Sequence, residues 1–428
     1  MDQEKKQKAL KILSDHRDSK LLTQLSSCVH CGLCAESCHY YLAFREDKYI
    51  PARKVELVTS IWRRYNTFAG KHFPGLMGAH ELDDLMAEEL TDQLFGACSL
   101  CNRCVPHCSI GVDIAYLVRT GRAMLSEMGM VPATLQATVN AALETGNNMA
   151  IPEDEFTDTI EWMEEELTDE FGDNGPFIPL NQPGKHVLYT LNPREPKFFP
   201  LSIAAMARIF YAAGESWTLS TRMYDVTNYA FFSCNREDAA IIAQRLVDEV
   251  KAMGAARCVL AECGHGSRAF RWEAPNYLGQ PFPFETLTNV ELMLEYLEQG
   301  RIKVDPSKNP GVFTLHDPCN LVRSGGIIEP QRKILKASVG QFVEMTPNRA
   351  DNYCCGGGGG QLAMSEYNER RMKIAEIKAD QIRKTGASVV VTPCHNCVDQ
   401  LMQINAWYKL NVQVKTLAEV VSDALIFD

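Results

Sequence analysis

Apolar and polar residues follow a helical period in the first 130 residues of the chain. Apolar side chains recur three and four positions apart, as on one helix face, in segments 5–25, 52–65, 81–95 and 112–128. The residues after them end in the Gly-, Pro- and Asn-rich stretch GDNGPFIPLNQPGK, which is typical of a connector. We therefore expect a helical domain at 1–130 and a connector at 131–184.

The pattern changes at residue 185, where short apolar runs begin to alternate with long helical segments. The apolar runs predict strands at 186–193, 258–263, 311–319 and 387–394, and the helical period predicts helices at 236–253 and 362–385. Alternating strands and helices are typical of α/β units.

This α/β part contains an internal repeat. Three pairs of segments align: 187–194 with 312–319, 229–234 with 353–355, and 258–266 with 389–397. We therefore divide the part into a first module at 185–310 and a second module at 311–428. Only the second module keeps all of the cysteines of the repeat.

Composition places the chain among ordinary soluble proteins. Of its 428 residues, 46% are apolar and 23% are charged. No run of about 18 apolar residues is present, and the N-terminus has no apolar core with a small-residue cleavage site. We expect a cytoplasmic protein with no direct membrane span, peripheral on the inner face of the cell membrane through partner subunits.

Charge is concentrated in one segment. The net charge is −11, and residues 153–173 hold 11 acidic residues without a lysine or arginine. We interpret this segment as a solvated linker or surface helix; a docking surface for a basic partner is the alternative. The chain lacks the basic stripe that nucleic-acid binding needs. It also lacks a G-x-G-x-x-G sequence after a predicted strand, so no flavin or nicotinamide site is indicated.

Cysteine usage predicts metal binding. Thirteen of the 16 cysteines fall into three groups, which leave out only Cys234, Cys258 and Cys263. In a large chain without an export signal, closely spaced cysteines are metal ligands more often than disulfides.

The first two cysteine groups share the ferredoxin spacing C-x2-C-x2-C-x3-C. Three cysteines at this spacing hold three corners of one 4Fe–4S cube, and the fourth cysteine reaches the neighbouring cluster. The spacing therefore assigns one cubane to Cys28, Cys31, Cys34 and Cys108, and a second cubane to Cys98, Cys101, Cys104 and Cys38.

Two zinc sites are the alternative for these runs, but zinc favours separated C-x2-C pairs around a tetrahedron. Ferredoxin runs usually place proline after the fourth cysteine, whereas His39 and Ser109 stand there. Proline supplies no ligand, so its absence indicates a specialised branch and leaves cluster binding intact.

The third group consists of Cys319, the pair Cys354-Cys355, and the pair Cys394 and Cys397. Adjacent cysteines point to opposite sides of an extended backbone, so a cluster of several irons suits them better than one ion. The glycines at 356–360 would let a bulky cofactor or a substrate approach closely. A flexible loop with incidental cysteines is the alternative.

With this third group, the chain resembles the D subunit of heterodisulfide reductase, in which a CCG module is joined to a two-cluster ferredoxin domain. In particular it resembles iron–sulfur subunits of transmembrane redox complexes in sulfate-reducing bacteria. Examples are the K subunit of the sulfite-reduction-associated complex and the B subunit of the tetrahaem-cytochrome-linked complex. The segments that carry the likeness are CVHCGLCAESCHYYLA, FYAAGESWTLSTRMYD, AECGHGSRAFRWEA, LHDPCN, NYCCGGGGG and VTPCHNC.

The resemblance implies an α+β multidomain fold, in which a helical two-cluster ferredoxin-like domain precedes two repeated α/β CCG modules. It also implies a noncubane 4Fe–4S cluster held by Cys319, Cys354, Cys355, Cys394 and Cys397. At the equivalent places the first module has Arg194, Ser233-Cys234, and Cys263 with Gly266. Two of five ligands cannot hold the same cluster, so we expect two cubanes and one noncubane cluster, with the first module as a scaffold.

These features predict a heterodisulfide reductase-like enzyme. We hypothesise that electrons pass from a membrane haem b cytochrome subunit through two cubanes to the noncubane cluster, where the disulfide of a small protein or small molecule is cleaved. His316 and His395, near ligand cysteines, are candidate proton donors to the leaving thiolate or hydrogen-bond donors to sulfur. His265 and Arg268 are weaker candidates.

A second hypothesis is an electron relay. The same layout resembles the iron–sulfur subunits of glycolate oxidase and anaerobic glycerol-3-phosphate dehydrogenase, which pass electrons from a flavoprotein towards quinone. The missing prolines and the GESWTL segment favour the first hypothesis.

Overall fold

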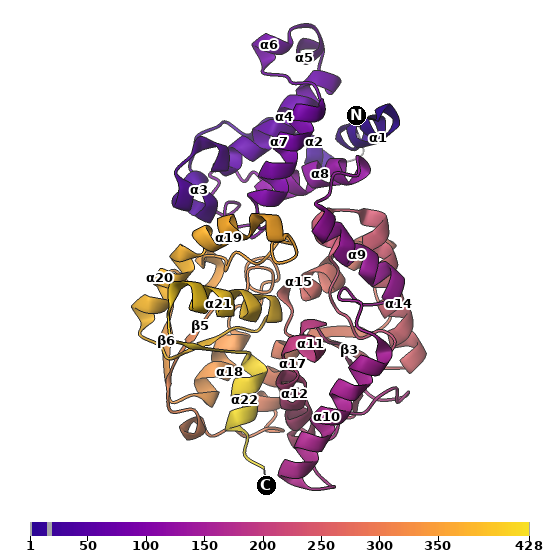
Figure 1. The fold of residues 1–428 in the computed structure, drawn as a ribbon, viewed down its shortest axis with the longest axis vertical. Coiled ribbons are helices and arrows are strands. Elements are labelled where there is room, and N and C mark those ends of the chain that lie inside the picture. The colour runs from indigo at the N-terminus through magenta and orange to yellow at the C-terminus, as the bar shows by residue number, and fades with distance from the viewer. Residues whose placement is uncertain (1, 15–18, 428) are drawn as a thin grey trace. The chain divides into compact units, whose positions relative to one another are not determined.

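The computed structural model describes residues 2–14 and 19–427, which form two compact units (Figure 1). Unit 1 holds the chain up to Ala137 together with Tyr229–Arg236 and Gly356–Ile377. Unit 2 holds Thr138–Asn228, Glu237–Cys355 and the chain from Lys378 onward. Two short segments of the α/β part thus belong to the N-terminal unit.

Unit 1 is helical, as the sequence predicts. Its helices are α1 (Gln3–Leu13), α2 (Ser19–Ser27), α3 (His39–Phe44), α4 (Pro51–Asn66), α5 (Phe68–His72), α6 (Pro74–Met77), α7 (Asp84–Thr91), α8 (Ile114–Glu127), α13 (Ala230–Ser233) and α19 (Asn368–Ile374). The apolar stripes of α4 and α8 pack together and bury Val58, Ile61 and Leu117. The segment expected as one helix at 5–25 holds α1 and α2, and its residues 15–18 lie outside the described residues.

Arg122 of α8 ties together three parts of unit 1 that are distant in sequence. Its side chain is fully buried, and Nε donates a hydrogen bond of 3.0 Å to the Leu94 carbonyl. Its Nη atoms donate bonds of 2.8 Å to the carbonyls of Phe232, Gly359 and Cys98. A buried guanidinium is stable because its donors meet carbonyl acceptors.

Unit 2 contains two four-stranded parallel sheets within the described residues. The first sheet has the order β2-β1-β3-β4, and the second has the order β6-β5-β7-β8. The strands of the first are β1 (Val187–Tyr189), β2 (Trp217–Thr218), β3 (Arg257–Leu260) and β4 (Glu285–Thr288); those of the second are β5 (Val312–Leu315), β6 (Gln341–Glu344), β7 (Val389–Val391) and β8 (Gln413–Lys415). The identical order, with β1 equivalent to β5 and β3 to β7, confirms two repeated α/β modules.

The other α-helices of the described chain lie wholly or partly in unit 2, and several of them share one apolar core with the strands. They are α9 (Ala133–Thr145), α10 (Glu153–Phe171), α11 (Arg194–Phe198), α12 (Leu201–Ala212), α14 (Arg236–Met253), α15 (Gly264–Ser267), α16 (Ala274–Leu278), α17 (Asn289–Glu298), α18 (Pro330–Ser338), α20 (Glu376–Thr385), α21 (His395–Tyr408) and α22 (Leu417–Ala424). The segment expected as one helix at 362–385 instead forms a turn, a short 3-10 helix, α19 and α20. The turn that follows the glycines extends into the start of this segment, and a further turn at Ala375 separates α19 from α20.

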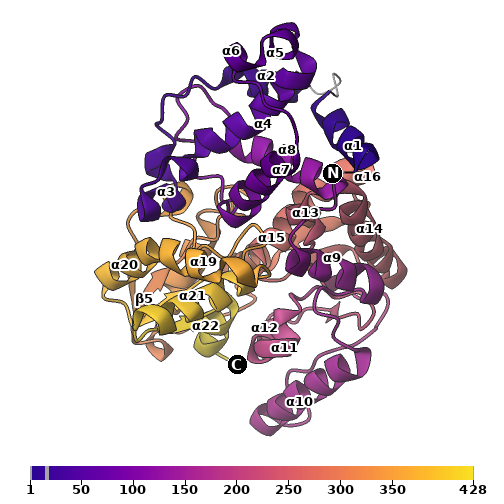
Figure 2. The ribbon, with the colours of Figure 1, turned by 45° about the horizontal axis from the view of Figure 1, so that its top comes forward.

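The acidic segment forms α10, which lies beside α11 and α12 (Figure 2). Phe156, Ile160, Met163 and Leu167 recur on one face of this helix and are fully buried. The acidic side chains occupy the other positions, which agrees with the interpretation as a surface helix.

No helix of the described chain is long and apolar enough to cross a bilayer.

The last helix of each module begins with the same capping box. In α17 the Thr288 hydroxyl accepts a bond of 3.3 Å from the Glu291 N–H, and the Glu291 carboxylate accepts one of 2.9 Å from the Thr288 N–H. In α22 the corresponding bonds of Thr416 and Glu419 measure 3.1 and 2.7 Å. The repeat therefore includes the capping box that begins the helix after the last strand of each module.

We expect Thr288→Ala and Thr416→Ala each to lower the free energy of unfolding by about 1 kcal/mol, because each removes a helix cap. Anaerobic denaturant unfolding followed by circular dichroism measures the effect. Thr288→Ser and Thr416→Ser keep the oxygen and should recover most of the stability. Serine variants as unstable as the alanine variants would contradict the capping role.

Candidate functional site

The two ferredoxin-type runs have the same backbone shape. The second residue after the first cysteine of each run, and the first residue after the second, have a positive φ: 54° at His30 and 80° at Gly32 in the first run, 49° at Leu100 and 59° at Asn102 in the second. A left-handed residue reverses the local direction of the chain. The two runs therefore change direction at the same two positions.

The structure brings the fourth cysteine of the first run to the second run. A cavity in unit 1 is lined by Cys38 together with Cys98, Cys101 and Cys104. In the first run, burial raises the pKa of the Cys28 thiol, and negative charge on Cys108 and Cys31 raises it further. The ferredoxin spacing predicts these same neighbours, because it puts Cys38 with the second run and Cys108 with the first. Both sets of four thiols fit a 4Fe–4S cluster.

Positive charge and N–H donors surround these cysteines. Lys54 is buried and lines the cavity at Cys38, and its ammonium donates a bond of 2.5 Å to the Ala97 carbonyl. Burial raises the pKa of the Cys38 thiol, and the Lys54 charge opposes this rise. At the end of the second run, the Val112 N–H donates a hydrogen bond of 3.3 Å to Cys108 Sγ. Both effects stabilise negative sulfur.

The second module gathers five buried thiols, which we call the cysteine cradle: Cys319, Cys354, Cys355, Cys394 and Cys397. Cys319 follows β5, whereas Cys394 and Cys397 occupy the N-cap and the first turn of α21. Cys319 Sγ lies 3.8 Å from Cys354 Sγ, and Cys355 Sγ lies 3.5 Å from Cys397 Sγ. Three separate segments thus contribute sulfur to one place.

The start of α21 stabilises a thiolate. A hydrogen bond from the Cys397 thiol lowers the pKa of Cys394 to about 7, and the N–H of Gly264 contributes from 3.4 Å. Thiols at helix N-termini commonly have a lowered pKa because unpaired N–H groups point at them.

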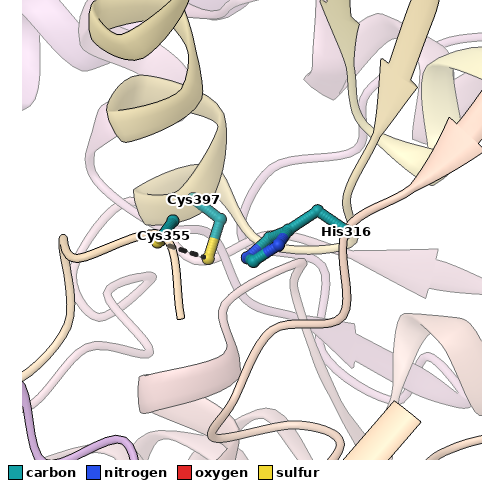
Figure 3. Close-up of side chains that lie close together, drawn as sticks. All are labelled: His316, Cys355 and Cys397. Atoms are coloured by element: carbon teal, nitrogen blue, oxygen red, sulfur yellow. Dashed lines mark hydrogen bonds between the residues drawn. The ribbon is translucent and has the colours of Figure 1, made fainter. Parts of the chain in front are cut away.

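His316 faces the cradle. The ring nitrogens of His316 and the sulfur atoms of Cys355 and Cys397 include a set within 4.8 Å of one another, and Figure 3 shows the imidazole directed towards both sulfurs. The ring is fully buried, and among the described residues Nε2 has no hydrogen-bond partner. A buried, unpaired polar atom beside two thiols of the cradle indicates that a bound group completes this site.

Two residues that the sequence analysis did not identify, Asn352 and Lys378, form a hydrogen-bonded chain that ends at His316. Asn352 Nδ2 lies 3.3 Å from His316 Nδ1, and Lys378 Nζ donates a bond of 2.8 Å to Asn352 Oδ1. Lys378 is fully buried, and burial lowers its pKa to about 8 against the opposing charge of the Cys355 thiolate. Asn352 stands two residues before the cysteine pair, but Lys378 has no signal in the sequence.

The donor set of the cradle fits an iron–sulfur cluster. Five sulfur donors are more than one tetrahedral zinc ion accepts, and thiolates are soft ligands that suit iron–sulfur clusters. Burial excludes water from them, because the most exposed of the five, Cys319, is 8% exposed.

The first module does not assemble a second cradle. Arg194, in the place of Cys319, forms an ion pair with Asp399 of α21. Ser233 and Cys234 belong to unit 1, and Cys263 is a buried thiol that accepts a bond of 3.3 Å from the Gly266 N–H. Cys258 lies in β3 and is fully buried.

The remaining candidate residues are held by other partners. His395 Nδ1 lies 3.2 Å from the Glu262 carbonyl and Nε2 lies 3.1 Å from Ser202 Oγ, and burial lowers the pKa of His395 to about 3. His265 Nε2 accepts a bond of 3.0 Å from the Asn228 N–H. Arg268 donates a bond of 3.2 Å to Asn320 Oδ1. His316 is thus the candidate histidine that the structure places against the thiols.

The glycines after Cys355 are required by their surroundings in unit 1. Gly359 has a φ of 66°, and a Cβ at this position would lie 2.6 Å from the carbonyl carbon of Ser99. Its carbonyl is one of the acceptors of Arg122. Shortly after the cysteine pair, the chain therefore packs against the second ferredoxin-type run.

Two family models match the chain. The 4Fe-4S dicluster domain matches residues 24–112, and the cysteine-rich domain called CCG matches residues 313–402. The chain thus combines a dicluster domain with a CCG domain, in the order that the sequence predicts.

Curated relatives match almost the whole chain. It is 29% identical to the Hdr-like menaquinol oxidoreductase iron-sulfur subunit 2 of Archaeoglobus fulgidus, over 97% of this chain and 81% of the relative. It is 26% identical to the D subunit of the dihydromethanophenazine:CoB–CoM heterodisulfide reductase of Methanosarcina acetivorans, over 94% and 95%. It is also 23% identical to the EtfAB:quinone oxidoreductase of Syntrophomonas wolfei, over 89% and 55%. The resemblance to the D subunit of heterodisulfide reductase is confirmed.

We expect Lys54→Met to make the potential of the cluster at Cys38 more negative by tens of millivolts, because a buried positive charge favours the reduced cluster. Redox titration followed by electron paramagnetic resonance measures the shift. Lys48→Met removes a charge that is half exposed and screened by water, and should leave the potential unchanged. Equal shifts in both variants would show that burial of Lys54 has no part in the effect.

We expect Gly359→Ala to destabilise the protein by more than the roughly 1–2 kcal/mol that a left-handed alanine costs, because its Cβ also meets the Ser99 backbone. Gly386→Ala is the matched control, since Gly386 has a φ of 65° and open space around it. The midpoints of denaturant unfolding compare the two, and equal losses would rule out the close approach to Ser99.

Proposed function

We propose that this chain, which joins a 4Fe-4S dicluster domain to a CCG domain, is the electron-transferring and disulfide-reducing subunit of a heterodisulfide reductase-like membrane complex. The two ferredoxin-type runs would hold cubane clusters that carry electrons one at a time, and the cradle would hold a noncubane 4Fe–4S cluster at which we expect a thiol–disulfide substrate to be reduced. The substrate is a small protein or a small molecule that carries a disulfide.

The observation that carries this proposal is the cysteine cradle. Beyond the two runs of four cysteines that suffice for cubane clusters, the second module presents five buried thiols and a buried histidine close to two of them. Cleaving a disulfide takes two electrons and two protons and yields two thiols, and clusters bound at the three cysteine groups would supply one-electron carriers.

The residues of the chain have separate tasks in this proposal. Cys28, Cys31, Cys34 and Cys108 hold one cubane, and Cys38, Cys98, Cys101 and Cys104 hold the other. The cradle cysteines hold the noncubane cluster away from water. The N–H groups at the start of α21 and the Lys378 ammonium favour negative sulfur there, both in the ligands and in the thiolates that reduction releases.

The name of one relative supports a membrane partner. The Archaeoglobus relative is named as a menaquinol oxidoreductase subunit, which supports a quinol-oxidising membrane subunit as our candidate electron donor. We propose that this subunit carries haem b. In that arrangement this chain binds the cytoplasmic face of the membrane subunit.

An electron relay between a flavoprotein and a quinone is the second candidate function. The similarity to an EtfAB:quinone oxidoreductase favours it. In that case thiols would leave the signals of all clusters unchanged.

We expect anaerobically purified protein to hold about twelve irons, as three four-iron clusters do, and to give a paramagnetic signal that responds to added thiol. Cys355→Ala should lose this signal and keep both cubane signals, because Cys355 lies in the cradle and the cubane ligands lie in unit 1. Cys258→Ala removes a buried thiol of β3 and should keep all the signals. Twelve irons without a response to thiol would favour the relay function.

A further inference from the structure

A line of buried polar groups lies behind the cysteine cradle. Lys378 of α20, Asn352 before the cysteine pair and His316 after β5 come from three separate segments, and each is at most 2% exposed. Burying an ammonium, an amide and an imidazole together costs free energy unless each atom has a partner. The hydrogen-bond partners of these three groups determine which ring nitrogen of His316 carries the proton.

The amide of Asn352 can face in only one direction. Lys378 Nζ has hydrogens to donate and lies 2.8 Å from Oδ1, so the amide oxygen faces the lysine. The amide nitrogen then donates to the Asp317 carbonyl at 3.0 Å and lies 3.3 Å from His316 Nδ1. With an N–H directed at it, Nδ1 is an acceptor and carries no proton.

The proton of the neutral imidazole must then be on Nε2. This atom has no partner among the described residues, and one ring nitrogen of His316 lies within 4.8 Å of the sulfur atoms of Cys355 and Cys397. Since Nδ1 faces Asn352, Nε2 is the nitrogen that is free to face these sulfurs. The donor face of the ring is therefore turned to the cradle thiols (Figure 3).

The backbone that carries His316 is also fixed. The carboxylate of Asp317 accepts two bonds of 2.8 Å from Arg332 and one of 2.7 Å from Gln331. All of these groups are buried. The chain at His316 can therefore move little without breaking this network.

The module without a cradle has leucines in place of the histidine and the lysine. In the repeat alignment, Leu191 stands in the place of His316. Lys378 stands seven residues before the end of α20, and the residue at that point of α14 is Leu246, a buried leucine. The buried histidine and lysine thus occur in the module that gathers thiols, and the other module has apolar residues at both positions.

We infer that Lys378 and Asn352 are positioning residues that hold His316 as a neutral imidazole with its proton on Nε2, so that Nε2–H donates a hydrogen bond to the sulfur of Cys355 or Cys397. The inference rests on the proposed function, because it assigns a task at the same site. A hydrogen bond to a ligand sulfur lowers its negative charge and favours the reduced cluster. A neutral imidazole that lost Nε2–H would become an imidazolate, so His316 is a hydrogen-bond donor and not the source of the product's proton.

The test compares variants of the anaerobic, cluster-loaded full chain. His316→Leu and Asn352→Leu should each shift the midpoint potential of the thiol-responsive signal to more negative values. Because Asn352 carries no charge and acts through His316, the double variant should shift no further than the larger single shift. Asn276→Leu removes an exposed amide elsewhere in unit 2 and should cause no shift. Additive shifts, or a shift in Asn352→Leu alone, would overturn the inference.

A second measurement does not depend on the folding of the variants. Electron–nuclear double resonance of the wild-type signal in light and heavy water should show an exchangeable proton coupled to the cluster. That coupling should vanish in His316→Leu and weaken in Lys378→Met. A wild-type signal without such a proton overturns this inference and leaves the proposed function intact. A wild-type protein without a thiol-responsive signal fails the proposed function, and the inference fails with it.

Discussion

The structure depends on one electrostatic constraint: thiolate sulfur has to be gathered and buried, and buried negative charge has to be balanced. Two of the thiol-rich sites meet this constraint with a buried lysine whose ammonium is held by an oxygen acceptor. Lys54 is anchored to the Ala97 carbonyl beside Cys38, and Lys378 is anchored to the Asn352 amide beside the cradle. Backbone N–H groups at Cys108 and Cys394 supply the rest of the balance.

Duplication of the α/β module explains the architecture of unit 2. The first module lacks the first cysteine, and Arg194 in its place pairs with Asp399 of the second module. Glu262, just after β3, accepts bonds of 3.0 and 3.2 Å from the N–H groups of Leu417 and Ala418, while its carbonyl accepts from the His395 N–H at 2.7 Å. The first module therefore supports the two helices of the second module, α21 and α22, that begin at these contacts.

The glycine run shows why the chain leaves one unit at Cys355 and enters the other at Gly356. Inside unit 1, Arg122 binds the carbonyls of Gly359 and Cys98 at once, and the missing side chain of Gly359 allows its backbone to approach Ser99. The glycines that follow the cysteine pair therefore fasten the chain to the second ferredoxin-type run.

The sequence by itself determined the fold class, the internal repeat and the three cysteine groups, because periodicity and ligand spacing are local properties of the chain. Even so, it joined α19 and α20 into one helix, since the periodicity continues through the interruption at Ala375. Only the tertiary structure decided that His316 and not His395 faces the thiols, because both histidines lie within three residues of a cradle cysteine in the sequence. Only the tertiary structure showed that Lys378 contacts Asn352. In the sequence, a lysine in a polar helix cannot be told apart from a solvent-exposed lysine, because its burial depends on the residues packed around it.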